Sequence, residues 1–351
     1  MSRTFDYIVI GQGIAGTTLS WQLRRRGLRV LVIDREAHDG ASQIAAGLIT
    51  PVTGKRLAKS WRWDELYPAA VAFYRSLEAE TGTRFFHERA SLRLFADDAE
   101  RDECHRRAGG IIAGLVRQTP PIPDCFTALL GGFELLSAAR LDVPRYLEAS
   151  REQFREDDSY LTADIDLAKD VELLPAACGI AKLNVQARGL VFCRGFTPGS
   201  DPWFGGVRFN AAKGEILTLR IPGLAEERVI HRGIWLAPAG GDLFRCGSTY
   251  KWDDLNCVPT AEARAEIEAR LRAFLRVPFE VIEHRAAVRP VIDAGYPVFG
   301  RHPAHPQLAY FNGLGSKGSL LAPFFAEQLA ACLIGEREPE PALDVRRFLA
   351  K

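Results

Sequence analysis

The segment from Phe5 to Asp34, FDYIVIGQGIAGTTLSWQLRRRGLRVLVID, constrains the fold of this chain more than any other stretch. Its residues 7–10 form a short apolar run that is typical of a buried parallel strand. Gly11, Gly13 and Gly16 follow in G-x-G-x-x-G register. Such glycines allow a tight turn, a close approach of the backbone to a pyrophosphate, and close packing of a helix on the strand. The segment therefore predicts a strand, a glycine turn, a helix and a second strand.

Asp34 ends the second predicted strand, where it can accept hydrogen bonds from the ribose hydroxyls of an adenosine. An acid there also disfavours a 2′-phosphate, which argues against NADP. A lone glycine motif is a weak signal, but here its strand, helix and acid are all in place. The alternative is a glycine-rich turn that binds no nucleotide, and the motif alone does not distinguish FAD from NAD. The arginines at 24–26 offset the dipole of the helix in its last turn, and we prefer this interpretation to a nucleic-acid patch.

The length of 351 residues is enough for two domains or for one large composite domain. A formal net charge of +1 gives no electrostatic reason to expect a nucleic acid or a membrane surface as partner. The best apolar run, 320–334, is interrupted by Glu327 and Gln328, so it predicts a half-buried helix and no membrane span. The nucleotide motif begins almost at Met1, so we expect no signal peptide.

Seven cysteines are scattered along the chain and are never spaced C-x-x-C. Their odd number and their spacing favour free thiols in a reducing cytoplasm over a disulfide framework or a zinc site. The seven histidines form no ligand pattern either. We therefore expect a cytoplasmic protein that holds no metal.

A second segment rich in small residues, DGASQIAAGLITP, runs from Asp39 to Pro51. It is either a loop packed on the first helix or the stretch that follows a flavin cofactor, because small residues are needed where backbone lies against a ligand. In the second case Ser42 and Gln43 supply polar contacts, and Gly47 allows the close approach.

The middle of the chain changes from helical to strand periodicity. Residues 55–80 predict a helix with a dense apolar stripe, and 84–95 alternate as an antiparallel strand does. Residues 97–118 are polar and predict a helix, and another helix is expected to begin at Asp142 or Val143. Further strands are predicted at 159–165, 189–195, 214–220, 233–238 and 242–250.

Several of these strands follow one another as a meander, with a hairpin-like turn at Gly240 and Gly241. A helix with Thr260 as its cap follows at 260–275. The nucleotide fold is therefore interrupted by an antiparallel sheet and then resumes. Residues 310–329, YFNGLGSKGSLLAPFFAEQL, predict a strand, a glycine loop and a helix, which would direct a second positive helix end at the site.

Together, and in this order, the motifs resemble the D-amino-acid oxidase superfamily of FAD enzymes, especially its glycine oxidase and sarcosine oxidase branch. The oxidase half of the bifunctional enzyme that completes methylaminomethyl-uridine in tRNA is similar too. The resemblance spans nearly the whole chain and rests on these segments: IVIGQGIAG with Asp34, GASQIAAGLITP at 40–51, LVFCRG at 190–195, CGSTY at 246–250, RPVIDAGYPVFG at 289–300 and GLGSKGSLLAP at 313–323.

The resemblance implies an α/β fold in which a Rossmann-type FAD-binding domain is interrupted by a smaller α+β substrate domain with a mostly antiparallel sheet. We expect the FAD-binding domain to comprise residues 1–80, 140–210 and 285–351. The substrate domain would comprise residues 81–139 and 211–284.

The resemblance also implies which residues hold FAD. Asp34 stands where many family members have Glu, which still suits a ribose. Ile165 would contact the adenine and Gly195 the pyrophosphate. No Cys or His lies at 42–50 or 313–318, so we expect a non-covalent flavin. The cofactor-binding residues are predicted to be Gly11, Gly13, Ile14, Ala15, Gly16, Asp34, Arg35, Ser42, Gln43, Ala46, Gly47, Leu48, Ile165, Gly195, Gly315, Ser316, Lys317 and Gly318.

On the substrate side, Arg289 matches the arginine that pairs with the substrate carboxylate in this family, and its fork suits a carboxylate. The alternative is a surface arginine before a proline. Trp235 falls near a tyrosine of glycine oxidase, which would give this pocket a larger apolar wall and argues against glycine as substrate. Tyr250 is a further pocket candidate, and His87 and Lys251 are expected to be structural.

The activity that the resemblance implies is FAD-dependent oxidation of the C–N bond of a small amino acid or an N-substituted glycine. A hydride would pass to flavin N5, water would hydrolyse the imine, and dioxygen or another acceptor would reoxidise the flavin. Lys317 could assist oxygen chemistry or bond the flavin, and we favour the second. The alternatives are a 2-hydroxy-acid dehydrogenase, a tRNA-modification oxidase and a non-catalytic flavin-binding module. The substrate, the acceptor and the oligomeric state stay open.

Overall fold

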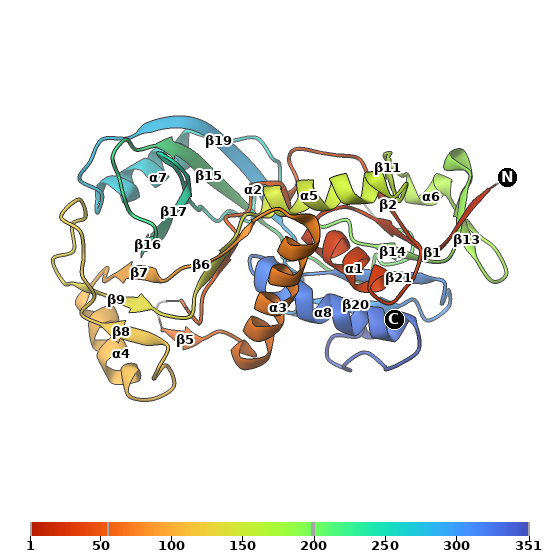
Figure 1. Cartoon of the computed structure of the whole chain (residues 1–351), viewed down its shortest axis with the longest axis horizontal. Coiled ribbons are helices and arrows are strands. Elements are labelled where there is room, and N and C mark those ends of the chain that lie inside the picture. The colour runs from red at the N-terminus through yellow and green to blue at the C-terminus, as the bar shows by residue number, and fades with distance from the viewer. Residues whose placement is uncertain (1, 55, 198–200, 350–351) are drawn as a thin grey trace.

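The computed structural model describes residues 2–54, 56–197 and 201–349 (Figure 1). Figure 1 shows two sheets at opposite ends of the long axis. Both chain termini lie on the side of the sheet that contains β1. The longer helices of the described residues are α1 (Ile14–Arg24), α3 (Trp63–Thr81), α4 (Asp98–Ala108), α5 (Val143–Glu156), α7 (Ala261–Arg272) and α8 (Gly318–Leu333). The short ones are α2 (Ala41–Ile44), α6 (Leu167–Asp170), the 3-10 turn η1 (Ala181–Leu183) and α9 (Arg346–Leu349).

The first sheet, here called the mixed sheet, has eight strands in the described residues. Its parallel centre runs β11-β2-β1-β14-β21, so the predicted strand–helix–strand unit is confirmed. The strands are β1 (Arg3–Ile10), β2 (Val30–Asp34), β11 (Tyr160–Thr162), β12 (Val171–Leu173), β13 (Cys178–Ile180), β14 (Val185–Phe192), β20 (Val298–Arg301) and β21 (Leu308–Asn312).

Both faces of the mixed sheet are covered, which explains the unbroken apolar runs in β1 and β2. Tyr7 and Val9 pack against α1, α3, α5 and α8 in one core. Ile8 and Ile10 point to the other face and pack in a second core with residues near the C-terminus. Such alternation along the strand is why a single strand can serve two cores.

The second sheet, here called the antiparallel sheet, also has eight strands in the described residues, with one parallel pair, β16 with β7. Its order is β19-β15-β18-β17-β16-β7-β9-β8, and α7 packs on one face. Thr260 caps α7 as predicted, because its Oγ accepts from Ala263 N at 3.3 Å. The strands are β7 (Ser91–Leu94), β8 (Val116–Gln118), β9 (Gly132–Leu135), β15 (Ala212–Arg220), β16 (Val229–Arg232), β17 (Ile234–Gly240), β18 (Leu243–Gly247) and β19 (Glu280–Arg289).

A third sheet, here called the small sheet, consists of β3 (Leu48–Ile49), β10 (Ala139–Leu141) and β6 (Phe86–Glu88). A short pair, β4 (Val52–Thr53) with β5 (Ala58–Lys59), follows β3. Three predictions of local structure were wrong in their extent. The helix expected over 55–80 begins at Trp63, after β5. The strand expected over 84–95 is two strands in two sheets, and the helix expected over 97–118 ends at Ala108 before β8.

The predicted division into domains stays a prediction, although β19 runs across its boundary between residues 284 and 285 and pairs along its length with β15. All seven cysteines are free in the structure. Within the residues that the structure describes, no helix is long and apolar enough to cross a membrane.

Candidate active site

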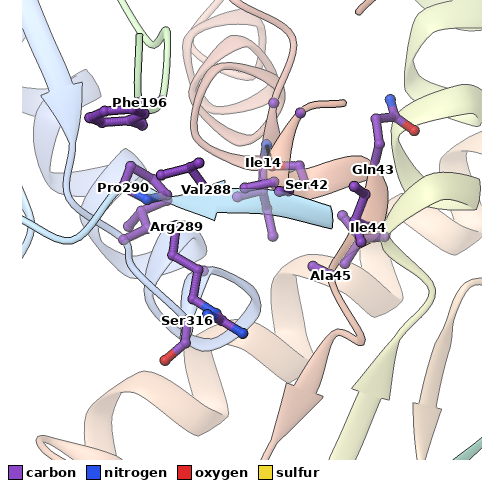
Figure 2. A pocket seen from close by; sticks show the side chains of 18 of the residues that line it. Ile14, Ser42, Gln43, Ile44, Ala45, Phe196, Val288, Arg289, Pro290 and Ser316 are labelled. Atoms are coloured by element: carbon purple, nitrogen blue, oxygen red, sulfur yellow. Dashed lines mark hydrogen bonds between the residues drawn. The ribbon is translucent and has the colours of Figure 1, made fainter. Parts of the chain in front are cut away.

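A cavity of about 630 Å³ lies between the mixed sheet and the antiparallel sheet. Its walls come from the turn after β1, the end of β2, the segment around α2, the chain after β14, the loop before α8, and strands β15, β17 and β19. Figure 2 shows Arg289 at the end of β19, and Ile14 and Ser42 among the side chains of the wall. The cavity therefore joins the predicted nucleotide turn to the predicted substrate sheet.

The first glycine turn has room for no side chain at two positions. Gly11 has φ +105°, and a Cβ there would lie 2.4 Å from Cys193 O. A Cβ on Gly16 would lie 1.9 Å from Gly11 O, so this glycine lets α1 pack on the turn. Both positions thus require glycine, as the motif predicts.

The N-terminus of α1 opens towards the cavity. Gly13 is its N-cap residue, no side chain caps the helix from that position, and the first turn holds no acid. Ser42 Oγ accepts from Ile14 N at 3.0 Å and so connects the turn to α2. A helix end of this kind, with free N–H groups and a positive dipole, binds anions such as a diphosphate.

Asp34 ends β2 beside this turn, as predicted. Its Oδ2 accepts from Gln12 N at 2.6 Å, and its Oδ1 accepts from Glu36 N at 2.6 Å. Each carboxylate oxygen keeps a further lone pair for a ribose hydroxyl. Arg35 follows on the wall, with its side chain about half exposed and 3.8 Å from Asp39.

Gly47 is required for a reason that the sequence did not show. Its φ is +73°, and a Cβ there would lie 1.8 Å from Leu141 O of β10. Leu141 N in turn donates to Gly47 O at 2.9 Å. The close approach is therefore to the small sheet, although Gly47 also lies on the cavity wall.

A second glycine loop precedes α8. Gly313 and Gly315 have positive φ, and Lys317 is the N-cap residue of a helix with no side-chain cap and no acid in its first turn. Burial lowers the pKa of Lys317, and no charged group of the described residues offsets that effect. The ends of two long helices and Lys317, which forms no ion pair within the described residues, therefore line one cavity, which suits a ligand with negative charge.

Arg289 lies across β15 at the other end of the cavity wall. Its Nη2 donates to Ser248 Oγ at 2.7 Å and to Thr249 O at 3.2 Å, and its Nη1 donates to Lys213 O at 3.3 Å. The guanidinium carbon lies 3.9 Å from the centre of the Tyr250 ring. Burial lowers the pKa of Arg289, and in the described residues it forms no ion pair. A bound carboxylate would supply the missing negative charge.

Gly214 is a site residue that we did not predict. A Cβ there would lie 2.0 Å from Arg289 Nη2, so the guanidinium occupies the space of a side chain. A glycine inside a strand indicates such a close approach, and Gly214 is the glycine of the GEILTLR strand. The identity of the group that approaches it depends on the pairing of β15 with β19, which the sequence does not show.

Trp235 lines the cavity from β17 and packs with Ile44, Ile216 and Ala287. Tyr250 lies at the mouth and is 50% exposed, and Trp252, 59% exposed, stacks on it with ring centres 6.1 Å apart. The wall is therefore apolar at Trp235 and aromatic at the mouth. Ser248, Arg194 and Phe196 are further wall residues that we did not predict.

Most of the predicted site residues meet on this wall. They are Gly11, Gly13, Ile14, Ala15, Asp34, Arg35, Ser42, Gln43, Ala46, Gly47, Leu48, Gly195, Trp235, Tyr250, Arg289, Gly315, Ser316, Lys317 and Gly318. Gly16 acts within the turn. Ile165 lies outside this wall, is 3% exposed and packs in the core on the other face of the mixed sheet; its adenine contact stays a prediction. His87 and Lys251 lie outside the wall, in the small sheet and beside β15.

The arrangement fits a dinucleotide. The glycine turn, the N-terminus of α1 and Arg194 suit a diphosphate, and Asp34 suits a ribose. Gly195 has φ +61°, and a Cβ there would meet no atom within 4 Å, so open space lies beside Arg194. Burial lowers the pKa of Arg194, which forms no ion pair in the described residues.

Comparison with known proteins gives one family. A family model described as FAD dependent oxidoreductase, DAO, matches residues 6–332. Glycine oxidase of Bacillus licheniformis is 24% identical over 356 residues, which cover 95% of this chain and 94% of that protein. The tRNA 5-methylaminomethyl-2-thiouridine biosynthesis bifunctional protein MnmC of Marinobacter nauticus is 25% identical over 358 residues, which cover 93% of this chain and 55% of that protein.

Solved structures agree with this match at the level of the fold. Glycine oxidase from Geobacillus kaustophilus superposes with a TM-score of 0.78 at 19% identity, covering 99% of this chain and 98% of that one. Iminodiacetate oxidase from Chelativorans sp. BNC1 superposes with a TM-score of 0.74 at 24% identity, covering 95% of this chain and 97% of that one.

Proposed function

The chain belongs to the DAO family of FAD-dependent oxidoreductases, and on that premise we propose that it oxidises the C–N bond of a small amino acid or an N-substituted glycine. The observation that carries the proposal is Arg289, a largely buried arginine without an ion pair in the described residues, on the wall of the cavity that the nucleotide turn also lines. A carboxylate on the substrate would supply the ion pair that Arg289 lacks.

Binding of that carboxylate requires an exchange of partners at Arg289. Both Nη2 hydrogens are engaged, by Ser248 Oγ and Thr249 O. A carboxylate that takes two parallel hydrogen bonds from the fork must replace at least one of them. The Ser248 hydroxyl can rotate away, whereas the Thr249 carbonyl is fixed by the backbone, so we assign the exchange to Ser248.

FAD, when bound, accepts the two electrons of the oxidation. The turn at Gly11 to Gly16 with Asp34 would hold its ADP half, and the loop at 313–318 with the end of α8 would offset negative charge on the flavin. Lys317 adds a cation at the same helix end.

No general base is assigned. The acids on the cavity wall, Asp34 and Asp39, belong to the nucleotide side, where Asp34 holds the turn and Asp39 lies near Arg35. The substrate amine would therefore have to arrive in its neutral form, with Arg289 as its anchor and Trp235 as the wall beside it. Because Trp235 is bulky and apolar, we propose an amine with an apolar or extended substituent over glycine itself.

A tRNA-modification oxidase is the second candidate. The observation that favours it is the exposed Tyr250–Trp252 stack at the mouth, since such platforms also hold nucleobases. The MnmC relative supports the same interpretation.

The test is an anaerobic titration of the FAD-loaded enzyme with amino acids, N-methyl amino acids, 2-hydroxy acids and total tRNA. Loss of the oxidised flavin absorption with one amine supports the proposal and identifies the substrate. Reduction by 2-hydroxy acids alone, or by tRNA alone, would contradict it in favour of the corresponding alternative.

A further inference from the structure

Arg140, in β10, is a buried arginine without adequate partners. It is 7% exposed, and its Nε has no hydrogen-bond partner in the described residues. Its nearest acid is Asp142, whose Oδ2 lies 3.9 Å from Nη2. A buried cation that lacks hydrogen bonds is costly, so its retention indicates a ligand that the protein alone does not supply.

Arg93 provides the contrast within the same molecule. It is also 7% exposed. Its guanidinium lies 2.5 Å from Glu100, and its Nη2 donates to Gly54 O at 2.9 Å. Arg93 is therefore fully paired at the same burial, whereas Arg140 is not.

The register of the small sheet turns Arg140 towards the cavity side. Arg140 pairs with Leu48 of β3 and with His87 of β6, so these three side chains share one face. Leu48 lies on the wall of the active-site cavity. Ile49 and Ala139, which alternate with them, point the opposite way into the hydrophobic core. Through Leu48, the face that carries Arg140 adjoins the cavity wall.

A second buried arginine approaches from the antiparallel sheet. Arg245 of β18 is 9% exposed, and it donates to Ala45 O at 2.9 Å and also to Ile44 O. Both of these carbonyls belong to residues of the cavity wall. Arg245 thus contacts the wall segment at 44–45, and Arg140 lies beside the same segment at Leu48. Burial, and then the charge of Arg140, lower the pKa of Arg245 to about 10.

The surroundings of the pair are positive. Arg89 acts on both Arg140 and His87, and burial with these two charges lowers the pKa of His87. Arg285 adds a further positive charge near Arg245, and the acids around the cluster are Asp142, Glu283 and Glu227, which lies 4.0 Å from Arg89. Cations outnumber acids here.

We propose that Arg140 and Arg245 form a second anion site, which receives a carboxylate at the far end of the substrate while Arg289 holds the first. The substrate class is therefore an amine that carries two carboxylates, such as an acidic amino acid or an N-carboxyalkyl glycine. This inference rests on the proposed function for its kinetic test, but not for its binding test.

The binding test uses the FAD-loaded enzyme and glutarate, a dicarboxylate without an amine, with butyrate as the monocarboxylate control. Glutarate should raise the thermal midpoint of the wild type more than butyrate does, and Arg140→Met should abolish the difference. Without added anion, Arg140→Met should keep or raise the midpoint, because it removes an unpaired buried charge. Arg93→Met, the matched control, should lower the midpoint and keep the glutarate effect.

The kinetic test compares D-glutamate with D-glutamine and iminodiacetate with N-methylglycine. Arg140→Met should raise KM for the dicarboxylate of each pair about tenfold or more and leave KM for its monocarboxylate partner within about twofold. Arg140→Lys, which keeps the charge but loses the fork, should fall between the wild type and Arg140→Met.

The outcomes separate the two proposals. An enzyme that oxidises none of the amines but shows the Arg140-dependent glutarate effect keeps the anion site and loses the proposed function. An equal response of wild type and Arg140→Met to glutarate, or an unchanged ratio of KM values, overturns the anion site and leaves Arg140 solvated by water alone.

Discussion

At the scale of single residues, the sequence predicts the nucleotide turn in full. It predicts Arg289 as the residue that binds the carboxylate, but not the glycine on which Arg289 packs. Gly16 needs glycine because a Cβ would meet Gly11 O, and Gly11 has a positive φ; both features are internal to a short segment, which a motif records, although a Cβ on Gly11 would also meet Cys193 O. Gly214 needs it because Arg289, distant in sequence, lies on it across two strands. Gly47 was predicted to allow a close approach to the flavin, which stays a prediction; the structure adds a close approach to the backbone of Leu141, which the sequence did not show.

Gly214→Ala tests whether the close packing of Arg289 on Gly214 matters for substrate binding. The added methyl would lie about 2 Å from Arg289 Nη2 and must displace the guanidinium. We expect KM for a carboxylate substrate to rise by about tenfold or more while the content of bound FAD is unchanged. Gly110→Ala is the control, because its methyl would come no closer than 3.7 Å to Arg107 O. Steady-state kinetics with unchanged KM in Gly214→Ala would mean that Arg289 does not bind the substrate.

His231 in β16 predicts an acid sensitivity. Burial, and then the charge of Arg93, lower its pKa to about 3, and its Nδ1 has no hydrogen-bond partner in the described residues. Because the unfolded chain has a pKa near 6.5, it takes up a proton between about pH 6.5 and 3 that the folded state refuses. The contribution of neutral His231 to the free energy of unfolding is therefore fully present above about pH 6.5 and is lost as the pH falls.

We expect His231→Leu to remove ~2 kcal/mol of the loss in unfolding free energy between about pH 7 and pH 5. Urea unfolding at the two pH values measures this loss. His105→Leu, at an exposed histidine of α4, should leave the loss as it is in the wild type. A loss in His231→Leu equal to that of the wild type would show that His231 titrates normally in the folded state.

At the scale of elements, the strand–helix–strand unit and the capped helix α7 were predicted because their signals are local. The apolar run, the glycines and Asp34 at the end of β2 occur within one segment. Thr260 lies next to the helix that it caps. The split of 84–95 into β6 and β7 was missed because both halves have strand character, and only their partners in β10 and β9 place them in different sheets.

The loop between β18 and α7 depends on two buried side chains of β15. Lys213 Nζ lies 2.7 Å from Asp254 Oδ2 and 2.9 Å from Asn256 Oδ1. Glu215 accepts from Thr260 N at 2.8 Å and from its Oγ at 2.9 Å. Both flank Gly214, so one short stretch of strand fixes the loop on one side and accommodates Arg289 on the other.

Lys213→Met should loosen this loop. The substitution leaves Asp254 and Asn256 without the ammonium that holds both of them, so we expect faster amide exchange at 251–259 in hydrogen–deuterium exchange. Lys251→Met is the control, since Lys251 joins β15 only through backbone hydrogen bonds with Lys213 in the described residues. Equal amide exchange in Lys213→Met and the wild type would mean that other contacts, and not Lys213, hold the loop in place.

At the scale of the whole molecule, function arises where the mixed sheet and the antiparallel sheet meet. One supplies the nucleotide turn and Asp34, the other supplies Arg289 and Trp235, and the cavity joins them. The sequence could predict both sets because each lies in its own motif. It could not predict that Arg245 of the antiparallel sheet and Arg140 of the small sheet both lie against the wall segment at 44–48, because that depends on how the sheets face each other.

The most direct test of the account is rapid anaerobic mixing of the FAD-loaded wild type and Arg289→Ala with one amine that reduces the wild-type flavin. We predict that Arg289→Ala keeps its flavin spectrum and its FAD content. The substrate concentration that half-saturates the rate of flavin reduction should rise by about a hundredfold or more, because a buried charge-assisted pair between Arg289 and the carboxylate is lost. Reduction of Arg289→Ala at wild-type substrate concentrations would contradict the account, since the carboxylate would then be held elsewhere.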